Sequence, residues 1–152
     1  MTTIIMLTGL VSVEKVSLTK ELATHFSAKQ AVTVIDNVAR LTLDADDLPD
    51  NVSLMRHAGS DMQSLENAIG QVNSEVMIVA ITEQAHPEKL FVSIENLRER
   101  LPDAAIFTLA MIDTRTCDCF PNVRAALEMY ADVTVMMPYD VESVIDYVSV
   151  SA

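Results

Sequence analysis

A lysine and a serine follow a glycine near the start of the chain, at a spacing typical of a phosphate-binding loop. The segment Thr8 to Ser17 contains Gly9, Lys15 and Ser17, and it stands between an apolar run and an amphipathic stretch. In such a loop, backbone N–H groups and the lysine neutralise phosphate, and a following hydroxyl holds magnesium. Gly9, Lys15 and Ser17 are therefore candidate nucleotide- or anion-binding residues.

Lys15 has two interpretations at this stage. It can be a solvated lysine in the first turn of a helix, which needs no ligand. It can also be a vestigial anion contact, in which Lys15 and Ser17 hold sulfate or a nucleotide weakly at the helix N-terminus. The sequence leaves both open.

The loop resembles that of the MinD and ParA group of P-loop ATPases, which reads Lys-Gly-Gly-x-Gly-Lys-Thr and then Ser or Thr. Over residues 10–17, only Lys15 and Ser17 match this pattern. Val16 replaces the magnesium-binding threonine, and Glu14 places a carboxylate where the β-phosphate would lie. The family's first lysine and its first two glycines fall on Leu10, Val11 and Ser12.

The resemblance extends along the chain. Val32 to Asp36 is similar to the family's second strand, which ends in an acidic switch residue, so Asp36 joins the candidate site. Val76 to Thr82, together with the helix that follows, is similar to a later strand and helix of the family. Val135 to Asp140 is similar to the family's "I-P-Y-D" start of a late helix. The resemblance implies one domain over residues 1–152, with a three-layer P-loop or Rossmann-like α/β fold. Its sheet would be mostly parallel, with about six strands flanked by helices.

Two further departures argue against catalysis. Thr82 to His86 stands where the family has a phosphate-facing aspartate and a glycine-containing switch, and Ile112 to Arg115 stands where a base-reading strand ends in asparagine. The chain has only three glycines, against an average of about seven per cent, which leaves little backbone for a phosphate cradle. We therefore expect a pseudo-ATPase.

Cys117 and Cys119 form a C-x-C pair shortly before a helix that begins at Pro121. Two thiolates supply half of a tetrahedral zinc or iron–sulfur site, and a two-fold homodimer could supply the other half. Some MinD-like metallochaperones and iron–sulfur carriers loosely resemble this arrangement. The alternatives are two half-buried structural thiols or a strained disulfide. No other cofactor is expected.

The three histidines and one acidic segment favour structural interpretations. His25, His57 and His86 have no neighbour that makes an obvious ligand or acid–base partner, so we expect caps or surface residues. Leu41 to Asn51 is rich in aspartate, but it lacks the glycine and glutamate that an EF-hand requires. We interpret it as a solvated acidic loop.

Short apolar runs alternate with helical periodicity, which predicts βα units around a parallel sheet. The predicted strands are Ile4 to Thr8, Val32 to Asp36, Ser53 to Arg56, Val76 to Thr82, Ala105 to Met111 and Val133 to Met137. The predicted helices cover about Lys15 to Lys29 and begin near Ser60, at Pro87, at Pro121 and after Asp140. Ser60 and Gln63 form the expected capping box of the second helix.

The composition excludes several classes of partner. Twenty-two acidic and ten basic residues give a net charge of −12, and no basic patch offsets it, so we expect no nucleic acid and a basic protein partner instead. No apolar run is long enough to cross a bilayer, and the first residues lack a signal peptide's basic region. We expect a cytoplasmic protein without membrane insertion.

The leading hypothesis is a non-catalytic MinD- or ParA-like domain that acts through protein–protein binding as a regulator or scaffold, with a homodimer left open. The alternatives are a metal or iron–sulfur carrier that uses the cysteine pair, and a weak nucleotide-binding protein with an atypical loop. A flavodoxin-like or receiver-like fold would show the same order of elements, although Gly9-Leu10 is not a receiver's acidic pair.

Overall fold

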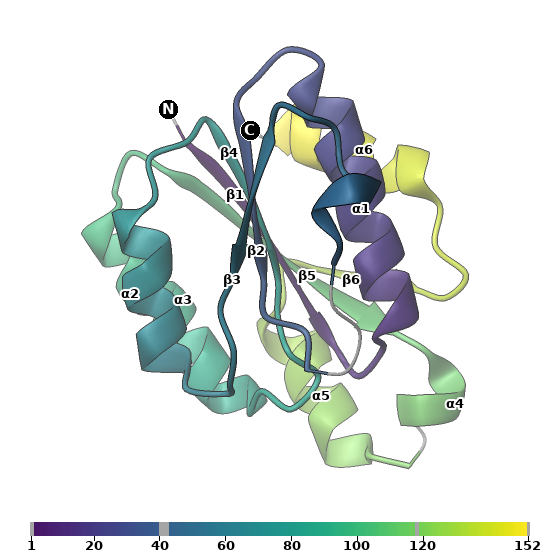
Figure 1. Cartoon of the computed structure of the whole chain (residues 1–152). Coiled ribbons are helices and arrows are strands. Elements are labelled where there is room, and N and C mark those ends of the chain that lie inside the picture. Colours follow the sequence, from purple (N-terminus) through teal and green to yellow (C-terminus); the bar gives the residue numbers. More distant parts are fainter. Residues whose placement is uncertain (1, 40–42, 118, 152) are drawn as a thin grey trace.

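The computed structural model describes residues 2–39, 43–117 and 119–151 (Figure 1). Its strands are β1 (Thr3–Gly9), β2 (Val32–Asp36), β3 (Val52–Arg56), β4 (Val76–Ala80), β5 (Ala105–Ile112) and β6 (Val133–Met136). Its helices are α1 (Val13–Ser27), α2 (Met62–Gln71), α3 (Pro87–Arg100), α4 (Thr114–Cys117), α5 (Pro121–Tyr130) and α6 (Val141–Ser151). Every strand predicted from the sequence is present, with its ends shifted by two residues at most.

The strands form one six-stranded sheet in the order β3-β2-β4-β1-β5-β6. Every pairing is parallel, so the sheet is more uniform than the mostly parallel one expected. β1 lies in the middle, where Met6 is in register with Val79 of β4 and with Thr108 of β5. This six-stranded parallel sheet with flanking helices confirms the predicted α/β fold class.

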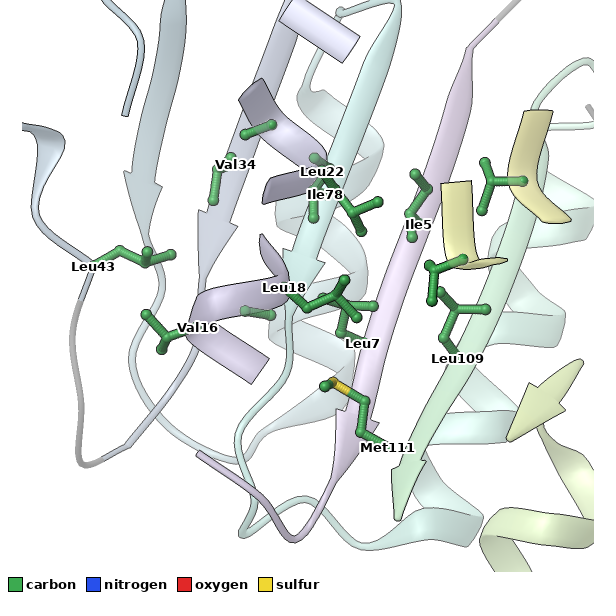
Figure 2. Packing of buried hydrophobic residues seen from close by; sticks show 14 of the residues in the cluster. Ile5, Leu7, Val16, Leu18, Leu22, Val34, Leu43, Ile78, Leu109 and Met111 are labelled. Atoms are coloured by element: carbon green, nitrogen blue, oxygen red, sulfur yellow. The ribbon is translucent and has the colours of Figure 1, made fainter. Parts of the chain in front are cut away.

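The two faces of the sheet carry separate apolar clusters. Along β1, Ile5 and Leu7 belong to one cluster and Ile4 and Met6 to the other, because successive side chains of a strand point to opposite faces. α1 and α6 cover the first face, and α2, α3 and α5 cover the second (Figure 1). Figure 2 shows Leu18 and other α1 side chains packed on the first face. Burial on both faces explains why the four inner strands, β1, β2, β4 and β5, are almost continuously apolar.

Helix starts follow the expected chemistry with one exception. α3 and α5 begin at prolines, which cost no hydrogen bond at the first helical position. Asp140 caps α6, because its Oδ1 accepts the Glu142 N–H at 3.1 Å. The predicted Ser60 cap of α2 is wrong: Asp61 caps this helix, and its carboxylate accepts the N–H groups of Gln63 and Ser64.

The remaining differences concern short segments. α1 begins two residues before the predicted start, and α4 forms a single turn that is not among the predicted helices. In the acidic segment, Asp44 caps a 3-10 turn over Ala45–Asp47 by accepting the Asp46 N–H; residues 41 and 42 lie outside the described residues. Among the helices that the structure describes, none is long and apolar enough to span a bilayer.

Candidate functional site

The candidate loop leaves the carboxyl end of β1, at the edge of the sheet where α/β proteins bind their ligands. Gly9 has a φ of +126°, and a Cβ atom there would collide with the carbonyl oxygen of Met111 on β5. Only glycine combines that backbone conformation with so close an approach. The retained glycine of the loop is therefore required by the packing of β1 against β5.

Lys15 lies in the first turn of α1, and its side chain is turned into the protein. Its exposed fraction is 0%, and Nζ donates hydrogen bonds to the carbonyl oxygens of Gly9 at 2.8 Å and Ile81 at 2.7 Å. Burial lowers the pKa of Lys15 from 10.5 to about 8, against the opposing effect of the Glu83 carboxylate. The interpretation of Lys15 as a solvated lysine is wrong.

Glu83 is the carboxylate that acts on Lys15. Both of its side-chain oxygens are almost completely shielded from solvent, and neither accepts a hydrogen bond from any residue that the structure describes. The sequence drew attention to Thr82-Glu83 only as a departure from the family pattern. In the structure, this departure from the family pattern places a carboxylate of the chain itself close enough to Lys15 to act on its charge.

Val16 occupies the position of the family's magnesium-binding threonine. Its exposed fraction is 4%, and it belongs to the apolar cluster under α1, where Figure 2 shows it on the side of Leu43. A side chain at this position faces the core of the domain. Position 16 therefore supplies no hydroxyl group to a metal ion, and its side chain is buried in the core.

Ser17, the other residue that matches the family pattern, has a separate partner. Its hydroxyl forms a hydrogen bond with Tyr139, on the loop between β6 and α6, while the Tyr139 hydroxyl donates to Glu21 Oε2 at 2.7 Å. Burial, followed by the Glu21 carboxylate, raises the pKa of Tyr139. Ser17 thus connects α1 to the Tyr139 loop, whereas Lys15 connects α1 to β1 and to the end of β4.

Asp36 ends β2 as expected. Its carboxylate is buried, and both of its oxygens have partners within the protein. Oδ1 accepts the Val38 N–H at 3.1 Å and pairs with Arg56 Nη1 at 3.0 Å, and Oδ2 accepts the Leu43 N–H at 2.9 Å. These contacts hold the chain that follows β2. The switch residue implied by the family resemblance is engaged in structural contacts.

The sequence reasoning missed Asn37, which joins three segments of the same edge. Its Nδ2 donates to the carbonyl oxygens of His57 and Gly59, and its Oδ1 accepts the Thr82 N–H at 2.9 Å. The sequence feature that could have identified Asn37 is its position as an amide residue directly after β2. Asp36, Asn37 and Lys15 together fill the carboxyl edge over β1, β2 and β4 with internal hydrogen bonds.

A pocket of about 370 Å³ lies beside the filled edge, at the ends of β5 and β6. It is lined by Glu14, Asp113, Thr114, Arg115, Met137, Pro138 and Tyr139. Asp113 accepts the N–H of Arg115 at 3.0 Å, which starts α4. Glu14 thus faces this pocket from the start of α1, in a region where two acids and one base gather.

The cysteine pair lies at and after the end of α4. Cys119 is exposed, and its Sγ lies 3.8 Å from the Arg115 carbonyl oxygen; the side chain of Cys117 lies outside the described part of the protein. Nowhere in the described residues do three or more His, Cys, Asp or Glu side chains gather as metal ligands. His25 and His86 are exposed, as predicted, and His57 is half-buried.

Comparison with known proteins places the fold. No family model matches the chain, and no curated protein matches it significantly. The Zn(II)-bound YjiA GTPase from E. coli superposes with a TM-score of 0.56 at 14% identity, over 97% of this chain and 54% of its own. The signal recognition particle receptor FtsY from Elizabethkingia anophelis superposes with a TM-score of 0.52 at 20% identity. The superposition covers 88% of this chain and 48% of the FtsY chain.

A de novo designed protein with the P-loop NTPase fold also matches, with a TM-score of 0.53 at 14% identity over 98% of this chain and 90% of its own. The chain spans about half the length of FtsY and of YjiA. At these identities the likeness concerns the fold alone. The MinD and ParA relationship therefore stays a prediction, and the architecture is that of the P-loop NTPase fold.

Proposed function

We propose that the chain is a non-catalytic, MinD- or ParA-like domain that acts by binding another protein, as a regulator or scaffold. The observation that carries this proposal is the inward orientation of Lys15. Its ammonium group is fully buried and donates to the carbonyl oxygens of Gly9 and Ile81. A lysine that stabilises phosphate must present its charge to the ligand, and this one presents it to the chain.

The surroundings of Lys15 support the same conclusion. Val16 places a buried methyl group where magnesium would need a hydroxyl. The Glu83 carboxylate already supplies negative charge near the ammonium, so an incoming phosphate would meet electrostatic repulsion. A nucleotide would have to displace several internal contacts before it could bind.

The charge distribution supports a basic partner on the α1–α6 side of the sheet. α6 contains Glu142 and Asp146, both exposed, and no lysine or arginine. α1 adds Glu14 and Glu21 on the same side, where its Lys20 is paired with Asp47 and its Lys15 is buried. A predominantly acidic surface attracts and orients a basic partner.

The catalytic half of the proposal is tested by phosphate release from ATP and from GTP with magnesium. The wild-type chain and Lys15→Ala should both release phosphate at the buffer rate. Because Lys15 is buried, circular dichroism must show that the variant is folded, and Ser17→Ala provides a milder second variant. Magnesium-dependent hydrolysis by the wild type that either substitution abolishes would contradict the proposal.

The binding half is tested by capture of basic proteins on the immobilised chain. The double variant Glu142→Gln with Asp146→Asn should retain less of the captured protein at low salt. The matched control is Glu99→Gln with Asp103→Asn, which removes the same charge from exposed positions at the end of α3. Equal losses with both double variants would show that the α1–α6 side is not the binding surface.

A second candidate function is a metal or iron–sulfur carrier. It is favoured by the exposed Cys119 thiol, which lies two residues after Cys117, the last residue of α4. Two such pairs brought together in a dimer would supply four thiolates. Elemental analysis of anaerobically purified protein tests it. Stoichiometric zinc or iron that Cys117→Ser and Cys119→Ser both remove would support the carrier, and its absence would end the idea.

A further inference from the structure

β6 ends the sheet on one side, and no strand among the described residues pairs with its outer edge. The backbone N–H and C=O groups along such an edge can form hydrogen bonds with another extended chain. β6 is short, with four residues, and none of them is charged, although a charged side chain is a usual protection of an edge strand. The backbone of β6 is therefore open to the addition of a strand.

A groove of about 310 Å³ runs between this edge and α6. Its lining is mostly apolar and includes Val135 and Met136 of β6 and Val144 of α6. Leu109 of β5, which belongs to the buried cluster on the α1–α6 face, also lines it, so the groove reaches the core. Because successive side chains of a strand point to opposite faces, a strand added to β6 would turn every second side chain toward this groove. Apolar residues at alternate positions would fill it.

The ends of the groove are acidic. Asp140 is the one charged residue among the described residues that line it, and α6 carries the exposed Glu142 and Asp146 without a lysine or arginine. Arg115 lines the neighbouring pocket, where two acidic residues accompany it. Basic residues that flank the apolar part of an added strand would therefore meet carboxylates. A second copy of this chain would instead bring the same acids together, and like charges oppose that pairing.

We propose that the basic protein partner adds an extended segment to the outer edge of β6, which lengthens the sheet by one strand. Alternate apolar side chains of the segment enter the groove against α6, and basic residues at its ends lie near Asp140 and the acids of α6. This inference rests on the proposed function, because it gives that partner a binding mode. A partner that contacts only the acids of α6 would satisfy the proposed function and not this inference.

The test measures the binding of a fluorescent synthetic peptide, Lys-Lys-Val-Thr-Val-Thr-Val-Lys-Lys, to the full chain by fluorescence anisotropy. Its valines alternate with threonines, so they share one face of an extended chain. Its lysines match the acidic ends of the groove. We expect a dissociation constant of about 10–100 μM. A peptide that does not bind at about 1 mM protein would overturn the proposal.

Methylation of the peptide backbone separates strand addition from other modes of binding. In an extended chain, the N–H groups of alternate residues point to the same side, so those of the valines face one edge and those of the threonines face the other. N-methylation of the set that faces β6 should raise the dissociation constant at least about tenfold, because several hydrogen bonds are lost. N-methylation of the other set should leave it within about twofold. Equal effects of the two patterns would overturn the proposal.

Met136→Lys places a positive charge on the edge strand beside the groove. The exposed fraction of Met136 is 43%, so the fold should tolerate the change, and the dissociation constant of the peptide should rise at least about tenfold. Met55→Lys is the matched control, because Met55 is 39% exposed on β3, at the opposite end of the sheet. Circular dichroism checks that both variants are folded. Equal weakening by the two variants would overturn the proposal.

Two outcomes distinguish this inference from the proposed function. If the immobilised chain captures basic proteins that Met136→Lys retains as well as the wild type, the proposed function stands and this inference falls. If the peptide binds as expected and the chain captures no basic protein, the proposed function falls and the edge of β6 remains a site of strand addition. Self-association is checked by sedimentation equilibrium: a dimer that Met136→Lys abolishes would assign the edge to a second copy and overturn the proposal.

Discussion

The Nζ atom of Lys15 lies 2.7 Å from the carbonyl oxygen of Ile81, although 66 positions separate the two residues in the chain. The same Nζ donates to the carbonyl oxygen of Gly9. One buried ammonium therefore ties the start of α1 to the end of β1 and to the segment that follows β4. In a phosphate-binding loop the lysine ammonium contacts the ligand. In this protein the Lys15 ammonium contacts backbone carbonyl groups of the chain itself.

The stability of the protein should increase as the pH rises from about 8 to 10. Burial lowers the pKa of Lys15 to about 8 in the folded chain, from an ordinary value of 10.5. Between these values the unfolded chain binds one more proton than the folded chain, so the free energy of unfolding rises by about 1.4 kcal/mol per pH unit. Urea denaturation at several pH values measures the slope.

Lys15→Met is the variant that isolates this contribution. It has no titratable group at position 15, so its free energy of unfolding should lack the rise that the wild type shows between about pH 8 and 10. Lys20→Met, at a partly exposed lysine paired with Asp47, should keep the rise. A wild-type slope that survives in Lys15→Met would mean that another group is responsible.

Gly9→Ala should destabilise the chain far more than Gly59→Ala. Both glycines have positive φ angles, so both alanines strain the backbone by about 1–2 kcal/mol. At Gly59 nothing lies within 4 Å of the new Cβ, whereas at Gly9 it collides with the Met111 carbonyl oxygen. We expect Gly9→Ala to cost more than about 4 kcal/mol in urea denaturation. Equal costs would show that β1 and β5 can separate at this point.

Asp36→Asn should lower the free energy of unfolding by about 3–5 kcal/mol, because it leaves a buried site without the charge that its partners require. The new amide group would face the N–H of Val38 or of Leu43, which both donate. Asp50→Asn, at an exposed aspartate, should change stability by less than about 0.5 kcal/mol. Thermal denaturation of the two variants decides between this structural role and a role in ligand binding.

Val16→Thr restores the hydroxyl of the family pattern, and we expect it to cost about 1–2 kcal/mol of stability without creating metal binding. The hydroxyl would lie in the core cluster, away from solvent. Val13→Thr, at an exposed valine of the same helix, should be neutral within about 0.5 kcal/mol. Isothermal calorimetry with nucleotide and magnesium would contradict this view if Val16→Thr acquired magnesium-dependent affinity.

The four inner strands, β1, β2, β4 and β5, could be predicted from the sequence because they are buried on both faces. A run such as Val76–Ala80 is apolar at every position and too short for a helix, so its type is visible locally. The prolines that open α3 and α5 are local signals too. The cap of α2 was misplaced by one residue, because Ser60 and Asp61 both have suitable side chains and only backbone geometry selects Asp61.

The contacts of the candidate site could not be predicted in the same way. Asn37 accepts from the Thr82 N–H, 45 positions away, and Glu83 acts on Lys15 across an even longer stretch of the sequence. No periodic pattern links such pairs, because the topology of the sheet brings them together. The loop pattern identified Lys15 as important, but its orientation depends on carbonyl groups that only the folded chain presents.

The position of β1 at the centre of the sheet also constrains how the protein can be made. β1 precedes both of its neighbours in the sheet, because β4 and β5 belong to later parts of the chain that extend to residue 112. Neither edge of β1 can form its native hydrogen bonds until those later strands have been synthesised. Such non-local pairing slows folding and leaves the apolar residues 3–9 exposed to aggregation for longer than a strand that pairs with its neighbour in sequence.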